Sequence, residues 1–259
     1  MQNRTRGIIA AAAALVLLLG VGAWYFLFRD TAPAEVDLDA ATEQVAEDRD
    51  SDADGGAAGD GDGGAADPGE AADGGISGTW TVDTGSGSFD FESATGSFAG
   101  FRVQEELVGL GTTEAVGRTG EVSGTVVIEG TLLESTEVEV DMASITTNIP
   151  RRDGRVLAAL EVEQYPSATF VLAEPVELGD GAARGEPVSV AAQGQMTIHG
   201  VTRDVTAALE AQLVDGTAVV VGTVPFTFED YDVEKPSAGS VISVADDATV
   251  EFQLLFTPA

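Results

Sequence analysis

The chain has 259 residues, which is enough for one sizeable domain plus accessory segments. It carries 12 Lys+Arg residues against 44 Asp+Glu residues, a formal net charge of −32, so its surface repels nucleic-acid phosphates and anionic lipid headgroups. We therefore expect no nucleic-acid partner, and any membrane attachment should be apolar rather than electrostatic. The lack of Cys and the single His exclude disulfides and leave almost no ligands for zinc or copper.

An apolar segment opens the chain. Gly7–Phe28 contains 22 uncharged residues, about the length that a membrane-spanning helix needs. Arg4 and Arg6 precede it, which places the N-terminus in the cytoplasm, and Trp24 lies where an aromatic belt would form. We predict that residues 1–29 form a transmembrane signal-anchor of a single-pass cell-membrane protein, with everything after them on the extracytoplasmic side.

A cleaved signal peptide is the alternative for this segment. Residues 32–34, Ala-Pro-Ala, have the small-x-small form of a cleavage site. However, the apolar stretch is longer than the usual signal-peptide core, and a bulky Trp-Tyr-Phe run at 24–26 stands where a cleavage region should be small. Cleavage would release a secreted protein, whereas retention would leave a membrane protein. Both outcomes place the rest of the chain outside the cytoplasm.

Residues 30–77 are an acidic, low-complexity segment rich in Ala, Gly and Asp. They carry 15 acids and one base, and their only aliphatic residues larger than Ala are Val36, Leu38, Val45 and Ile76. Because so few apolar side chains cannot offset the conformational entropy of the chain, we predict a disordered linker that its own charge extends. The linker would lift the following domain off the bilayer, or else be an acidic tail without a specific partner.

The rest of the chain, residues 78–259, has the pattern of an all-β domain. Apolar and polar residues alternate with a period of two, which is typical of strands that face a core on one side. The clearest runs are 138–142, 188–198, 205–213 and 250–256. Many antiparallel strands suggest a barrel or a sandwich, and closure into a barrel removes exposed strand edges. An eight-stranded barrel can hold one small ligand.

Turn and helix signals divide this domain. Asp215-Gly216 is a strong hairpin signal, and His199-Gly200 separates two further runs in the same way. One short helix is expected at Arg152–Val162, where apolar residues recur at helical spacing. It should end before Pro166, because the residue preceding a proline disfavours the helical conformation.

Four stretches of this domain resemble the YceI-like family of lipid-binding barrels. They are 97–103 (SFAGFRV), 144–170 with its SITT, RRD and YPSATF motifs, 194–205 (GQMTIHGVTRDV), and 226–236 together with 250–256. The matches keep the family order and cover roughly residues 78–259. The resemblance implies an extended, eight-stranded, antiparallel lipocalin-like barrel whose interior holds a polyisoprenoid chain, such as an isoprenoid quinone or a polyprenyl lipid.

One position departs from the family pattern. Relatives often carry a His near position 105, whereas this chain has Glu105-Glu106, so contacts with a ligand headgroup are expected to differ here. The predicted anchor and the acidic linker lie outside the resemblance, and many relatives are soluble periplasmic proteins with cleaved signals.

Candidate ligand-binding residues lie on the inward face of the predicted strands and in the loop before the helix. The apolar set is Phe101, Val103, Val140, Met142, Phe170, Met196 and Ile198. Arg152 and Asp153 could clamp a polar headgroup at the barrel mouth, or fix the loop with Asp153 in the favourable first helical turn. Arg151 and Arg155 add charge nearby. The same alternation would also fit a filled barrel that acts as a structural or stress-response surface domain through protein contacts.

We expect no catalysis, no metal, and no cofactor other than the bound isoprenoid lipid or quinone. A lipid-modifying enzyme would have to use His199 or Glu105 as its base, and His199 is better explained as a turn residue whose ring bonds the backbone. The acidic residues form no EF-hand loop. The expected partners are the apolar ligand and, through the N-terminal helix, the membrane; the oligomeric state stays open, with a homodimer as one option.

Overall fold

The structure is a computed structural model and describes residues 32–55, 75–91, 94–109, 111–235, 239 and 241–259. The predicted anchor at 1–29 lies outside the described residues, as does the linker stretch 56–74. Among the helices that are described, none is long and apolar enough to cross a membrane.

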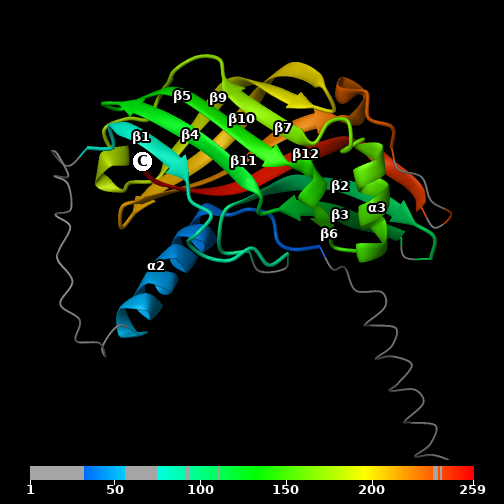
Figure 1. Ribbon diagram of the computed structural model, residues 1–259, viewed down its shortest axis with the longest axis horizontal. Helices are drawn as coiled ribbons and strands as arrows, with labels where there is room; N and C mark the ends of the chain where they lie inside the picture. Colours follow the sequence, from blue (N-terminus) through cyan, green and yellow to red (C-terminus); the bar gives the residue numbers. More distant parts are fainter. Residues whose placement is uncertain (1–31, 56–74, 92–93, 110, 236–238, 240) are drawn as a thin grey trace, which may run out of the picture.

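Twelve strands form one antiparallel sheet (Figure 1). The first six are β1 (Gly78–Val82), β2 (Phe98–Leu107), β3 (Gly111–Thr119), β4 (Val122–Glu129), β5 (Leu132–Asp141) and β6 (Thr146–Thr147). The last six are β7 (Ser167–Leu172), β8 (Val176–Glu177), β9 (Val188–Ile198), β10 (Val201–Val214), β11 (Thr217–Thr227) and β12 (Val241–Pro258). The helical elements are α2 (Leu38–Gly55), α3 (Pro150–Ala159) and the short 3-10 turns η1 (Met142–Ser144), η2 (Ala182–Arg184) and η3 (Phe228–Tyr231).

Eight of these strands close into a barrel. Their hydrogen-bonded order is β1-β4-β5-β7-β9-β10-β11-β12, and β12 pairs again with β1, with Thr81 opposite Thr257. The predicted all-β, eight-stranded antiparallel barrel is therefore confirmed. β2 and β3 lengthen the wall on one side, because β2 pairs with the first part of β12 and β3 pairs with both β2 and β6.

The two ends of the barrel carry different elements. α3, β6 and the start of β12 lie at one end, on the right of Figure 1, whereas β1 and the C-terminus lie at the other. We call the first the α3 end. The second is the η2 end, because η2 meets the last part of β10 there through a hydrogen bond from Gln212 to the Gly185 carbonyl.

Both predicted hairpin turns are present. Asp215 and Gly216 have φ angles of 47° and 85°, and His199 and Gly200 have φ angles of 53° and 74°, as a two-residue hairpin turn requires. The predicted short helix is also present, and it starts at Pro150 because proline fits the first helical turn.

The segment that precedes the barrel corrects one prediction. Residues 33 and 34 bind side chains on the outside of β2 and β3, and α2 then packs against β10 and β11 (Figure 1). The expectation of disorder throughout residues 30–77 is therefore wrong for residues 32–55. We call residues 32–47 the strap.

Residue spacing explains why the strap folds. Leu38, Ala41 and Val45 share one side of α2 and are buried. Their partners on the barrel wall are Val219, Val221 and Leu255. Asp37 accepts a hydrogen bond from the Ala40 amide at 2.9 Å and so caps the start of the helix. The prediction of disorder counted only aliphatic residues larger than alanine. It therefore overlooked this apolar face of α2, to which Ala41 contributes.

Candidate functional site

The barrel encloses an apolar cavity of about 430 Å³, a size typical of ligand pockets. Inward side chains from every strand of the closed barrel line it, and few polar groups interrupt the wall. The aromatic part of the lining includes Trp80, Phe101, Phe170, Phe226, Phe228 and Phe252. A cavity of this size argues against the alternative of a barrel filled by its own side chains.

Eight of the nine predicted ligand-binding residues line this cavity. They are Phe101, Val103, Val140, Met142, Phe170, Met196, Ile198 and Arg152. The ninth, Asp153, lies outside the lining and accepts hydrogen bonds from the Thr147 amide and hydroxyl at 2.9 and 2.6 Å. Asp153 therefore fixes the loop before α3, as the alternative interpretation of this residue proposed. For the other eight residues, contact with a ligand stays a prediction.

Three of the lining rings lie against glycines. A Cβ atom added to any of these glycines would overlap the ring opposite it. The pairs are Gly117 with Phe101, Gly194 with Phe170, and Gly222 with Phe252. Each glycine lies on the strand next to the one that carries the ring. The ring therefore lies against the barrel wall, in the space that a side chain at the glycine position would fill. Sequence alternation identifies the phenylalanines but not this role of the glycines.

An ion pair stands in the cavity wall at the α3 end. Glu105 and Arg152 both line the cavity, and their side chains bind each other although both are largely buried. Arg152 also donates to Asn148 Oδ1 at 2.7 Å, and Thr113 donates to Glu105 at 3.4 Å. Burial lowers the pKa of the Arg152 guanidinium, and the neighbouring Glu105 opposes that shift. The position that departs from the family pattern, Glu105, thus neutralises Arg152.

Two further arginines line the α3 end without an acidic partner. Arg151 and Arg155 are exposed, and among the described residues neither guanidinium lies within ion-pair distance of a carboxylate. At the η2 end, by contrast, the lining residue Glu186 binds Arg184 at 2.9 Å. The uncompensated positive charge of the cavity lining is therefore at the α3 end.

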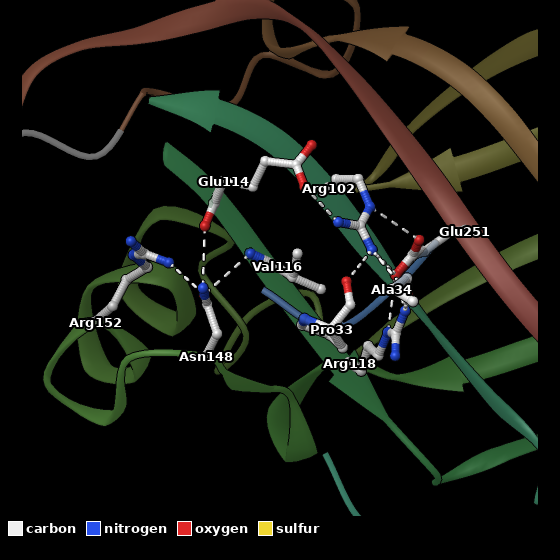
Figure 2. Close-up of polar contacts among 9 residues, drawn as sticks. All are labelled: Pro33, Ala34, Arg102, Glu114, Val116, Arg118, Asn148, Arg152 and Glu251. Carbon is white, nitrogen blue, oxygen red and sulfur yellow. Dashed lines mark hydrogen bonds and ion pairs between the residues drawn. The ribbon is translucent and has the colours of Figure 1, made fainter. Parts of the chain in front are cut away.

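A second charged cluster lies on the outside of the same wall (Figure 2). Glu251 of β12 accepts hydrogen bonds from Arg118 at 2.8 Å and from Arg102 at 3.2 Å, and all three side chains are buried. Glu114 binds Arg102 at 2.6 Å. Burial lowers the pKa of Arg118; burial would do the same in Arg102, but Glu251 and Glu114 together raise its pKa.

The strap completes this outer cluster. Arg102 donates to the carbonyls of Pro33 and Ala34 at 2.9 and 3.1 Å, and Arg118 donates to Ala34 at 2.8 Å (Figure 2). These carbonyls accept guanidinium hydrogens that the carboxylates leave free, as buried charges require. Strand alternation is consistent with the outward direction of Arg102 and Glu251, but it gives no sign that the strap covers them.

Glu114 and Asn148 connect the two charged clusters. Asn148 donates to the Glu114 carbonyl at 3.0 Å, and its own side-chain oxygen accepts from Arg152 at 2.7 Å and from the Val116 amide at 3.1 Å (Figure 2). The Glu114 carboxylate binds Arg102 on the outer face. A continuous series of hydrogen-bonded groups therefore leads from the strap to Arg152 in the cavity wall.

His199 is a turn residue apart from the cavity. Its Nδ1 atom lies 3.1 Å from the Tyr231 carbonyl, and its ring packs edge-on against Tyr165 with centroids 4.7 Å apart. The ring does not line the cavity. Within the described part of the chain, no three His, Asp or Glu side chains converge to hold a metal ion.

Comparison with known proteins decides the family. A family model described as the YceI-like domain matches residues 80–256, well over half of the chain. The chain belongs to the YceI-like family. The YceI-like domain is a binding fold rather than a catalytic one, so the expectation that the protein is not an enzyme is confirmed.

Solved structures resemble this chain at low sequence identity. A polyisoprenoid binding domain from Saccharophagus degradans, implicated in plant cell wall breakdown, is 23% identical with a TM-score of 0.54, over 70% of this chain and 98% of its own. BcnA from Burkholderia cenocepacia is 20% identical with a TM-score of 0.47, over 61% and 95% of the two chains. The Campylobacter jejuni YCEI protein is 17% identical with a TM-score of 0.42, over 54% and 82%. A comparison with curated proteins finds no match.

Proposed function

We propose that this YceI-like protein is a membrane-tethered, extracytoplasmic binding protein that holds one apolar isoprenoid-type lipid, a quinone or a polyprenyl chain, inside its barrel. The observation that carries the proposal is the apolar cavity of about 430 Å³. A flexible isoprenoid would be held mainly by burial of apolar surface, at about 25 cal/mol per Å². The Saccharophagus degradans relative, described as a polyisoprenoid binding domain, supports this class of ligand.

The strap supports an uncleaved anchor. If a signal peptidase cut after Ala34, the carbonyls of Pro33 and Ala34 would leave the chain, and buried Arg102 and Arg118 would lose these acceptors. A buried charge that loses its partners is strongly destabilising. The alternative of a secreted protein therefore fits the outer cluster less well than retention in the membrane by Gly7–Phe28.

Mass spectrometry of lipids extracted from the purified full-length protein tests the ligand. We expect an isoprenoid quinone or a polyprenyl lipid. Ala192→Phe should remove it, because Ala192 is fully buried on β9 and lines the cavity. Ala191→Phe is the matched control, since Ala191 is the neighbouring residue on the same strand and is exposed. A wild-type protein that carries no lipid, or an Ala192→Phe protein that keeps it, would overturn the proposal.

Intact-mass analysis of the protein from salt-washed membranes tests the tether. We expect the complete chain in the membrane fraction. A mature protein that begins at Glu35 would show that the anchor is removed and that the barrel is released.

A further inference from the structure

The strap limits the distance between the barrel and the proposed anchor. Phe28 ends the apolar stretch, and the carbonyl of Pro33 is already bound to Arg102 at 2.9 Å. Five residues of fully extended chain reach at most about 18 Å. Pro33 therefore lies within that distance of the bilayer surface, whatever conformation the intervening residues take. A long acidic spacer between the membrane and the barrel is excluded if the anchor is retained.

The part of the barrel that the strap holds near the membrane is the α3 end. In Figure 1 the first residues of the strap run beneath β2 and β3 toward β6, on the side where α3 lies. In Figure 2 hydrogen bonds lead from Pro33 through Arg102, Glu114 and Asn148 to Arg152 in the cavity wall. The strap thus begins beside the cavity end that carries the arginines.

Exposed apolar side chains project from this same end. Val108 follows β2 and is 62% exposed, and Ile242 near the start of β12 is 58% exposed; among the described residues these are the two most exposed large hydrophobic side chains. Leu107 pairs with Val241 across β2 and β12, so Val108 and Ile242 belong to one rim. Val108 also lines the cavity, which places the rim at its opening. Apolar groups gathered at one edge indicate a contact surface.

Two arginines of this end favour contact with an anionic lipid surface. Residues 78–259 carry 29 acids and only 8 bases, yet Arg151 and Arg155 stand together here without an acidic partner among the described residues. They are four residues apart on α3, so their like charges repel each other, and Arg151 lies in the first turn, where the helix dipole also disfavours a cation. An anion opposite them would relieve this repulsion. A bilayer of anionic lipids would attract these two arginines, whereas it would repel the acidic remainder of the barrel, including the exposed Glu106 beside Val108.

We propose that the α3 end is a membrane-docking face, a proposal that rests on the tether of the proposed function. Val108 and Ile242 enter the interfacial region of the bilayer, and Arg151 and Arg155 contact anionic headgroups. The cavity then opens toward the membrane. A lipid ligand passes between the bilayer and the barrel without crossing bulk water.

Single introduced cysteines can test this orientation, because the chain contains no cysteine. Val108→Cys and Ile242→Cys place a fluorophore at the α3 end, and Asp180→Cys places the same fluorophore on an exposed residue beside η2. The full-length variants are reconstituted into vesicles of phosphatidylcholine and phosphatidylglycerol that contain brominated lipids. We expect quenching of most of the fluorescence at positions 108 and 242 and none at 180. Equal quenching at all three positions, or none at 108 and 242, would overturn the docking face.

A charge reversal tests the role of the arginines. Arg155→Glu should reduce quenching at position 108 in the anionic vesicles, whereas Arg184→Glu, an equal change of charge at the η2 end, should not. The difference should vanish in high salt, because screening weakens exposed charges. Equal effects of the two reversals would overturn the assignment of Arg155 to the membrane surface.

The docking face and the proposed function can fail separately. If the protein stays in the vesicles but the fluorophores at 108 and 242 are not quenched, the tether is supported and the docking face is refuted. Protein that does not stay in the vesicles would lose both. The lipid extracted from the purified protein reports on the ligand in either case.

Discussion

Two clusters of arginine and glutamate lie on opposite sides of the same barrel wall, and they differ in what covers them. On the outer side, Glu251 holds Arg102 and Arg118, and strap carbonyls seal the group. At the cavity end, Glu105 holds Arg152, while two neighbouring arginines keep no acidic partner among the described residues. In the outer cluster, arginine and glutamate therefore hold the strap to the barrel. At the cavity end, the same residue types leave positive charge available to a partner.

Five of the eight bases of residues 78–259 stand in these two clusters. In a domain with so few cations, their placement is informative. We call the outer cluster closed, because each of its charges has a partner within the protein, and the cluster at the cavity end open. Substitutions in the closed cluster should lower the stability of the fold, whereas substitutions in the open cluster should weaken binding. The following substitutions test that division.

The largest effect is expected from Glu251→Gln. It leaves Arg118 without an acid and Arg102 with Glu114 alone, so the unfolding free energy should fall by about 3–5 kcal/mol, as for a broken buried ion pair. Denaturant unfolding of the full-length protein in detergent measures it. Glu210→Gln, at an exposed position of β10, is the control and should change stability by less than about 0.5 kcal/mol. Similar losses in both variants would show that the outer cluster is not a structural centre.

Leu38→Ala should release the strap. Leu38 is 6% exposed against the barrel wall, and its truncation should weaken docking by about 2–3 kcal/mol. Native-state hydrogen exchange of the α2 amides should therefore accelerate while the amides of β9 and β10 stay protected. Glu43→Gln, on the exposed side of α2, should leave exchange unchanged. Unaltered protection in Leu38→Ala would mean that the hydrogen bonds of residues 33 and 34 hold the strap by themselves.

Glu105→Gln is the same substitution as Glu251→Gln, made in the open cluster instead of the closed one. Arg152 keeps its hydrogen bond to Asn148, so the loss should be smaller, about 1–2 kcal/mol. The same denaturant experiment compares the two variants directly. A loss as large as that of Glu251→Gln would show that the two clusters are equally closed and would remove the distinction drawn above.

The smallest effect on stability is expected from Arg155→Gln. Arg155 has no ion pair among the described residues and stands four residues from Arg151, so its neutralisation should change the unfolding free energy by less than about 0.5 kcal/mol. Thermal or denaturant unfolding without vesicles measures it. A clear destabilisation would reveal a structural partner and weaken the assignment of this residue to a membrane surface.

The barrel and most of its lining could be predicted from the sequence because strand alternation is local. The run 250–256, for example, places Val250 and Phe252 inward from neighbouring residues alone, and turn residues at His199-Gly200 mark a hairpin in the same way. The resemblance to the YceI-like family then supplied the closure and the class of ligand.

The outer cluster and the strap could not be predicted in this way. Arg102 and Glu251 are separated by 149 residues, and no local pattern announces that two such side chains meet. The strap binds through a weakly apolar helix face and through backbone carbonyls. Every residue has a backbone carbonyl, so the sequence does not show which carbonyls will accept such hydrogen bonds. The charge of Arg151 and Arg155 near the barrel mouth was visible in the sequence, but the structure was needed to show that, among the described residues, Glu105 pairs with Arg152 and not with these two arginines.

The glycines under the cavity rings have a consequence for how such a barrel changes its selectivity. The three glycines have no Cβ atom, and each therefore leaves room for a phenylalanine ring that would otherwise be displaced. They are Gly117, Gly194 and Gly222. A methyl group added at Gly117 would force the Phe101 ring to move, and at Gly194 or Gly222 it would press on a ring and on a backbone carbonyl as well. The shape of the pocket thus depends on three wall positions that contribute no side chain of their own.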